Sequence, residues 1–166
     1  DGQPLLALGC TYARDPIFRV TAPFILPFPA AATVTPVSLE ECIDNQEPGR
    51  FSKATLKSTA QNINATWTKS GHLHGHARKV RSRAKPTTGS VSYALFLGYL
   101  TGARGQALFQ TEYIKLLDCP FDKAIELAID ASRKGWIVCK RVGNVIEVLF
   151  PNLINQEEME WLREQD

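Results

Sequence analysis

The chain has 166 residues, of which 44% are hydrophobic and 22% charged, a composition that is typical of globular proteins and excludes disordered and fibrous ones. Its net charge of +2 is unevenly distributed: residues 1–47 and 112–166 each have a balance of −4, whereas residues 48–111 contain ten basic residues and no acidic one. So long an acid-free stretch favours a polyanionic partner, and we expect nucleic acid, with a membrane surface or an acidic protein as alternatives.

The first part of the chain is predicted to contain two helices separated by a proline-rich stretch. The first helix is expected over residues 5–13. The apolar stretch from Val20 to Ala32 contains three prolines and has no basic flank, which excludes a membrane-spanning helix and a signal peptide. Ser38 and Glu41 predict a capping box that opens a short helix ending before Pro48. We therefore expect a soluble, cytoplasmic protein.

A longer helix is predicted after Ser52, which can cap its start. Apolar residues recur at helical spacing and are expected to face a core: Leu56, Ala60, Ile63 and Trp67. The opposite side gathers small, amide-bearing and basic residues: Lys57, Ser58, Gln61, Asn62, Ala65 and Lys69. Such a face suits the DNA major groove, where Gln and Asn can bind adenine through two hydrogen bonds.

A basic hairpin is predicted after Gly71, which ends this helix. The hairpin turns near Gly75, and its second strand is expected over residues 79–86. The order of two helices and then a basic hairpin predicts a winged helix-turn-helix, whose second helix lies in the major groove. Arg81, Arg83 and Lys85 alternate along the second strand and are expected to share one face. The residues expected to bind DNA are Lys53, Lys57, Ser58, Gln61, Asn62, Lys69, Arg78, Lys79, Arg81, Arg83 and Lys85.

The turn-forming segment from Pro86 to Ser90 predicts a boundary between residues 1–86 and residues 87–166. The second part repeats the same order of elements. Helices are expected over residues 91–100, 111–117 and 120–134, followed by a hairpin over residues 136–150 that turns at Gly143. The predicted fold class is therefore mainly α with small β-hairpins, arranged as a tandem winged helix-turn-helix.

The two predicted units differ in charge. The long helix of the second unit exposes Asp122, Glu126 and Asp130, which would repel phosphates. Asn155 and Glu158 predict a capping box for a C-terminal helix. We expect double-stranded DNA to contact the first unit, and residues 87–166 to serve an architectural role or to bind other proteins.

No catalytic or metal-binding motif stands out. The four cysteines are far apart and form no C-x-x-C pair, so reduced thiols are expected. His72, His74 and His76 alternate as a zinc or nickel site would require, but their cationic surroundings favour contacts with phosphates. The basic block contains no carboxylate to hold Mg²⁺, and no nucleophile or phosphate-loop motif is present. We expect no enzyme, no cofactor and no metal.

The segment from Phe51 to Lys57, the helix that continues to Trp67, and the stop at Gly71-His72-Leu73 resemble the BrxA family, the small DNA-binding proteins of BREX bacteriophage-defence systems. The resemblance covers roughly half of the chain. It implies a helical, non-catalytic, cytoplasmic bacterial protein that binds DNA as an accessory part of a larger defence assembly. A protein-protein adaptor, a transcriptional regulator and an RNA-binding protein stay open as alternatives.

Overall fold

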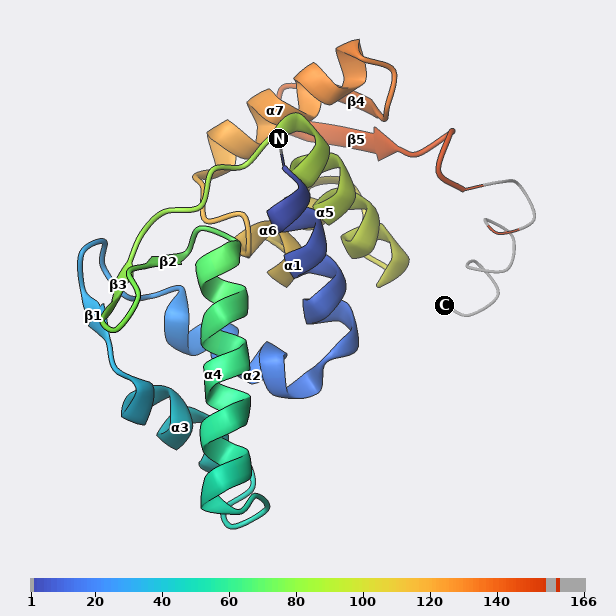
Figure 1. Cartoon of the computed structure of the whole chain (residues 1–166). Helices are drawn as coiled ribbons and strands as arrows, with labels where there is room; N and C mark the ends of the chain where they lie inside the picture. The colour runs from blue at the N-terminus through green and yellow to red at the C-terminus, as the bar shows by residue number, and fades with distance from the viewer. Residues whose placement is uncertain (1, 155–157, 159–166) are drawn as a thin grey trace. The chain divides into compact units, whose positions relative to one another are not determined.

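A computed structural model describes residues 2–154 and residue 158 of the chain. The described part is mainly helical, with two small antiparallel sheets, which confirms the predicted class of helices with small β-hairpins. The chain divides into two compact units (Figure 1). We call residues 3–85 the N-terminal unit, and residues 86–166 with residues 1–2 the C-terminal unit. No described helix combines the length and the apolar character needed to cross a lipid bilayer.

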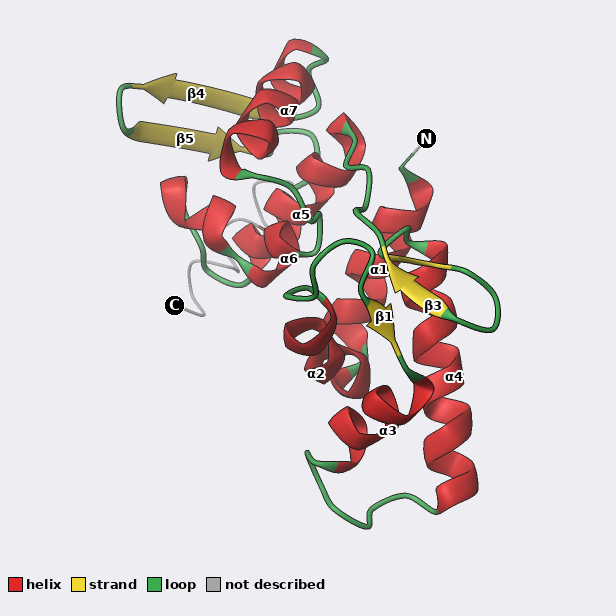
Figure 2. Cartoon of the chain, turned by 90° about the vertical axis from the view of Figure 1, so that its left-hand side faces the viewer, coloured by secondary structure: helices red, strands yellow, loops and turns green. Residues whose placement is uncertain are grey.

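The N-terminal unit consists of four helices and a three-stranded sheet (Figure 2). Its elements in chain order are α1 (Gln3–Arg14), α2 (Pro16–Ile25), β1 (Thr33–Val34), α3 (Pro36–Asp44), α4 (Lys53–Lys69), β2 (Leu73–His74) and β3 (Lys79–Arg81).

Helix α1 confirms the helix predicted over residues 5–13, whereas α2 was not predicted. Helix α2 begins where the carboxylate of Asp15 accepts hydrogen bonds from the backbone N–H groups of Ile17 and Phe18. Pro16 occupies the first helical turn, where its missing N–H leaves no hydrogen bond unmade. The helix continues through Pro23, so the prolines of this stretch do not prevent helix formation at its start.

The sheet of the N-terminal unit has the order β1-β3-β2, and both pairs are antiparallel. Thr33 pairs with Val80, and Leu73 pairs with Arg81, so β3 is the central strand. Strand β1 was not predicted, because two extended residues carry no periodicity and their partner is distant in sequence. Strand β3 ends at Arg81 and is shorter than the strand predicted over residues 79–86.

Helix α3 begins earlier than predicted. Its N-cap is Thr35, whose hydroxyl accepts a hydrogen bond from the backbone N–H of Ser38 at 3.1 Å. The predicted capping box of Ser38 and Glu41 is therefore wrong. Pro36 at the first helical position explains the shift, because its fixed φ suits the first turn and it needs no acceptor.

Helix α4 confirms the prediction at both ends. The hydroxyl of Ser52 accepts a hydrogen bond from the backbone N–H of Thr55, and Gly71 follows the helix with a φ of 85°. Trp67 is fully buried and stacks on Phe18 with ring centroids 4.8 Å apart. Its indole N–H donates to the hydroxyl of Thr21 at 3.0 Å. The apolar side of α4 thus anchors the core of the N-terminal unit and leaves its opposite side exposed.

The C-terminal unit combines helices with one hairpin. Its described elements are α5 (Thr88–Leu100), η1 (Gly105–Gln110), α6 (Glu112–Lys115), α7 (Phe121–Arg133), β4 (Val138–Val142) and β5 (Val145–Leu149). Helix α5 begins three residues before the predicted start, because Thr87 and Ser90 form a capping box. The hairpin turns at Gly143 as predicted, with Val142 paired to Val145. The C-terminal helix predicted after Asn155 lies outside the described residues.

Candidate nucleic-acid interface

The exposed face of α4 consists of the residues that the sequence analysis selected. The apolar stripe faces inward, with Ala60, Ile63 and Trp67 buried. The polar and basic residues of the opposite face are exposed: Lys53, Lys57, Ser58, Gln61, Asn62 and Lys69. Positions four apart on a helix lie on one side, so Lys57, Gln61 and Ala65 form one row. This face carries no acidic side chain.

A groove lies between α4, α3 and the loop that joins β2 to β3. We call it the helix–hairpin groove; its polar lining residues are Glu40, Lys57, Gln61, Asn64, His76 and Lys79. Pro36 and three alanines complete its walls. The fold thus brings Lys57 and Gln61 of α4 beside Lys79 of β3, three residues that the sequence analysis assigned to DNA contact.

Two polar residues of the helix–hairpin groove, Asn64 and Glu40, were not predicted to belong to a site. Asn64 is only 7% exposed, and its Oδ1 atom has no hydrogen-bond partner among the described residues. Glu40, from α3, is half-buried. The helical period of α4 places Asn64 four residues after Ala60, on the margin of the apolar stripe, and this spacing is a signal that sequence analysis could have used.

Two basic residues of the hairpin are held by hydrogen bonds within the N-terminal unit. The guanidinium of Arg78 donates from Nε and Nη2 to the hydroxyl of Thr33, at 3.0 and 2.7 Å. Lys79 donates from Nζ to the carbonyl oxygen of Gly75 at 2.7 Å. Arg78 is exposed and Lys79 half-buried, so these contacts restrict both cations without covering them fully.

The assignment of Arg81 to the DNA interface is wrong. Arg81 is 1% exposed, and its guanidinium donates to the carbonyl oxygens of Ile25, Leu26 and His72 at 3.1 to 3.2 Å, and also to that of Ser82. The physical reason is the register of β3, which pairs Arg81 with the buried Leu73 and so places its side chain on the inner face of the sheet, at the carboxyl end of α2. A cation is favoured there because the last carbonyl groups of a helix lack internal partners.

The three alternating histidines do not share one exposed face. His72 is fully buried, and its Nδ1 atom lies 2.8 Å from the hydroxyl of Ser70. Its ring also packs edge-on against Trp67, with centroids 4.9 Å apart. The expectation that His72 contacts phosphates is therefore wrong, whereas His74 and His76 are exposed. Within the described residues, no cluster of three or more His, Cys, Asp or Glu side chains is placed to hold a metal ion.

The remaining predicted cations lie outside the helix–hairpin groove. Lys69 lines a depression between α1 and α4, together with Gln3 and Thr66. Arg83 and Lys85 are exposed beyond the end of β3. The cations predicted to bind DNA therefore extend from the start of α4 to the segment after the hairpin, and among them only Lys57 and Lys79 line one groove together.

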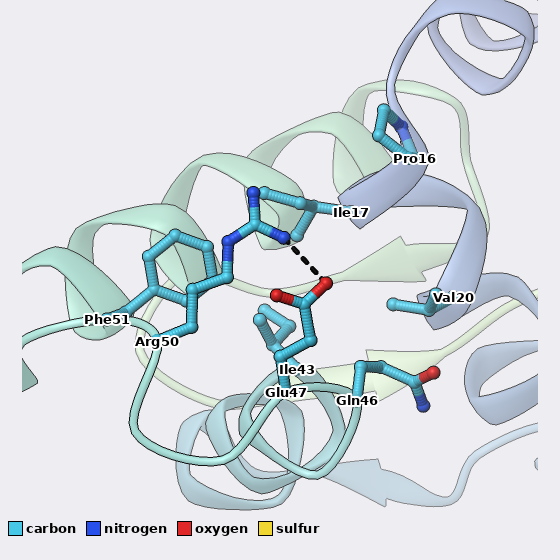
Figure 3. A pocket seen from close by; sticks show the side chains of 8 residues that line it. All are labelled: Pro16, Ile17, Val20, Ile43, Gln46, Glu47, Arg50 and Phe51. Atoms are coloured by element: carbon cyan, nitrogen blue, oxygen red, sulfur yellow. Dashed lines mark hydrogen bonds and ion pairs between the residues drawn. The ribbon is translucent and has the colours of Figure 1, made fainter.

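A second groove of the N-terminal unit lies between α2, α3 and the loop before α4 (Figure 3). Its walls are apolar, with Ile17, Val20 and Ile43 among the lining residues. Figure 3 shows Arg50 and Glu47 meeting at its edge, where Nη1 and Oε1 are 2.9 Å apart. Arg50 is the one basic residue that lines this groove, and Glu47 neutralises its charge. The groove therefore offers little attraction to phosphate.

The C-terminal unit presents a different surface. On α7, Glu126 and Asp130 form ion pairs with Lys123 and Arg133, so its acidic side is partly neutralised. At the turn of the β4–β5 hairpin, Val142 and Val145 are 79% and 72% exposed. Neighbouring exposed apolar side chains are a feature of surfaces that contact other proteins.

No protein-family model, no curated protein and no solved structure matches the chain.

Proposed function

We propose that this protein is a non-catalytic double-stranded DNA-binding protein that uses its N-terminal unit to contact the duplex. The observation that carries the proposal is the exposed face of α4, which combines Lys57, Gln61 and Asn62 and contains no acidic side chain. Phosphates attract such a surface regardless of sequence, and the amide side chains offer hydrogen bonds to base edges.

The element order of the N-terminal unit supports a winged helix-turn-helix. From α2 onward the order is helix, strand, helix, helix, strand, strand, and the sheet has the order β1-β3-β2. In that arrangement α4 is the recognition helix and the β2–β3 hairpin is the wing. The C-terminal unit has a related order, with α5, α6 and α7 followed by the β4–β5 hairpin, which supports a tandem of two such units.

The biological setting we propose follows the resemblance to the BrxA family. The protein would act in the bacterial cytoplasm as an accessory part of a BREX-like phage-defence assembly. In this proposal the N-terminal unit holds DNA and residues 87–166 contact other proteins of the assembly. The exposed pair Val142 and Val145 is the observation that favours a protein partner for the C-terminal unit.

A salt titration of binding to random-sequence duplex tests the proposal. Six predicted DNA-binding cations besides Lys69 remain accessible at the surface: Lys53, Lys57, Arg78, Lys79, Arg83 and Lys85. If about six of them meet phosphates, the slope of log K against log salt is about −5. Fluorescence anisotropy with a labelled duplex measures this slope.

A matched pair of double variants locates the contact. Neutralising two groove cations with Lys57→Gln and Lys79→Gln should reduce the magnitude of the slope by about 2, because two phosphate contacts are lost. Lys115→Gln and Lys123→Gln remove the same charge from the C-terminal unit, where both lysines pair with glutamates, and should leave the slope unchanged.

A slope near zero for the native chain would contradict DNA binding and favour a protein-protein adaptor. Preference for A-form RNA in a direct competition would favour RNA binding.

A further inference from the structure

Glu40 and Glu41 are the two acidic side chains of residues 3–85 that lack a local partner, and of the two only Glu40 is half-buried, since Glu41 is exposed. Asp15 caps α2, Asp44 accepts a hydrogen bond from the backbone N–H of Gly49, and Glu47 pairs with Arg50. Within residues 3–85, all of which the structure describes, no hydrogen bond or ion pair reaches the carboxylate of Glu40. It is half-buried in the helix–hairpin groove, beside the cations Lys57 and Lys79.

Asn64 adds a second unused acceptor to the same groove. Its side chain is more than nine-tenths buried, and its Oδ1 atom has no partner among the described residues. A buried amide without its hydrogen bonds costs free energy, and such groups in native proteins commonly mark the place of a ligand or an ordered water. Gln61, one helical turn away, lines the groove with a further amide. The groove therefore combines a half-buried carboxylate and a buried amide oxygen with two lysines.

This combination matches one chemical feature of the DNA major groove. A carboxylate on a DNA-binding surface repels phosphates, and hydrogen bonds that it accepts from a base can offset this cost. In the major groove the donors on base edges are the exocyclic amino groups, N4 of cytosine and N6 of adenine. Glutamate is suited to accept from such an amino group, and lysines on either side are suited to the neighbouring phosphates.

On the basis of the DNA binding proposed above, we propose that Glu40 is a specificity-determining residue that selects a base with an exocyclic amino group, cytosine or adenine, in the helix–hairpin groove. Asn64 and Gln61 supply the adjacent amides, and Lys57 and Lys79 hold the flanking phosphates. This assigns part of the base selection to α3, whereas the exposed face of α4 was the only base-reading surface expected from the sequence.

Selection from a random duplex library tests the role of Glu40. The native full-length chain should enrich cytosine or adenine at one position of the selected duplexes, and Glu40→Ala should lose that enrichment while still binding random duplex. Glu41→Ala is the matched control, because Glu41 is exposed on the same helix, does not line the groove and carries the same charge. It should keep the enrichment. Thermal unfolding of each variant verifies that the fold is retained.

Base analogues identify the amino group directly. In the selected duplex, the enriched cytosine is replaced by 2′-deoxyzebularine, which lacks the 4-amino group, or the enriched adenine by 2′-deoxynebularine, which lacks the 6-amino group. The native chain should lose about 5- to 150-fold in affinity, the range of discrimination expected for one well-made base contact. Glu40→Ala should bind the natural and analogue duplexes equally well.

The outcomes separate the two proposals. If the native chain binds random duplex but shows no enrichment, or if Glu40→Ala enriches the same bases as the native chain, the role of Glu40 is overturned and DNA binding by the N-terminal unit is retained. If the native chain binds no duplex even at low salt, both proposals are overturned.

Discussion

The Nε atom of Arg81 donates a hydrogen bond to the carbonyl oxygen of Ile25 at 3.1 Å. This bond joins strand β3 to the last residue of α2, and the same guanidinium reaches the carbonyl oxygens of Leu26 and His72 at 3.2 Å. Arg81 therefore connects three segments of the N-terminal unit that are far apart in the sequence. Its charge adds hydrogen bonds to carbonyl groups at the end of the helix, where the oxygen of Ile25 also accepts a bond from the backbone N–H of Phe28 at 3.3 Å.

Replacing Arg81 with alanine should destabilise the N-terminal unit strongly. The substitution removes the hydrogen bonds that the guanidinium donates to four carbonyl oxygens and opens a cavity, and we expect a loss of about 3 kcal/mol in the free energy of unfolding. Urea denaturation followed by circular dichroism measures this loss. Arg83→Ala, at an exposed position on the same segment, should change the stability by less than about 0.5 kcal/mol. Equal stabilities of the two variants would contradict the structural role of Arg81.

The hydrogen bond between Trp67 and Thr21 leads to a second prediction on stability. The hydroxyl of Thr21 accepts from the indole N–H and itself donates to the carbonyl oxygen of Phe18 at 2.7 Å. Thr21→Val keeps the volume but removes both bonds and leaves the buried indole N–H of Trp67 unsatisfied. We expect a cost of about 1–3 kcal/mol, measured by thermal and urea unfolding. Thr21→Ser, which keeps the hydroxyl, is the control and should lose less.

Local signals along the sequence predicted most of the helices and the second hairpin. Ser52, the apolar spacing that ends at Trp67, and Gly71 define α4 within the sequence itself, and Gly143 defines the turn between β4 and β5. These elements depend on caps, periodicity and turn chemistry, all of which act over a few residues. For that reason their bounds and their exposed faces could be predicted.

The errors concern residues whose environment depends on distant partners. The alternation of Arg81 and Arg83 predicts one strand face, but β3 ends at Arg81, and its pairing with β2 places Arg81 opposite the buried Leu73. His72 is likewise buried by its contact with Trp67 across the end of α4. Glu40 was not selected from the sequence, because nothing in its neighbourhood indicates that α3 contributes to the helix–hairpin groove.

The unpartnered oxygen of Asn64 predicts a gain in stability on its removal. Asn64→Leu replaces a buried polar group with an apolar one of similar size, and the penalty of the unsatisfied acceptor disappears. We expect the free energy of unfolding to rise by about 1 kcal/mol in the absence of DNA. Urea denaturation provides the measurement, and Asn62→Leu, at an exposed position of α4, should leave stability within about 0.5 kcal/mol of the native value. A clear loss of stability in Asn64→Leu would show that the amide makes a bond in solution.

Three thiols should react slowly in the folded protein. Burial raises the pKa of the Cys42, Cys139 and Cys119 thiols, and for Cys119 the neighbouring charge of Asp118 raises it further. A raised pKa lowers the fraction of the nucleophilic thiolate at neutral pH. Alkylation by iodoacetamide, followed by mass spectrometry, should therefore be slow at pH 7.5 and accelerate up to about tenfold for each pH unit while the pH stays below the pKa. Unfolding in urea removes the burial and should accelerate alkylation at constant pH. Rates at pH 7.5 that are equal in the folded and unfolded chain would contradict this prediction.

Lys57 and Gln61 occupy one row of α4, and their substitution should affect DNA binding in different ways. Lys57→Ala removes a phosphate contact, so affinity should fall about equally for all sequences and the magnitude of the salt slope should fall by about 1. Gln61→Ala removes a group that can bind only a base edge or a neutral acceptor, so the salt slope should persist while the preference at one base position relaxes by about 1–3 kcal/mol. Anisotropy titrations at several salt concentrations, on a selected duplex and its single-position variants, separate the two effects. If Gln61→Ala weakens binding to every sequence equally, α4 contacts only the phosphate backbone and does not read bases through this row.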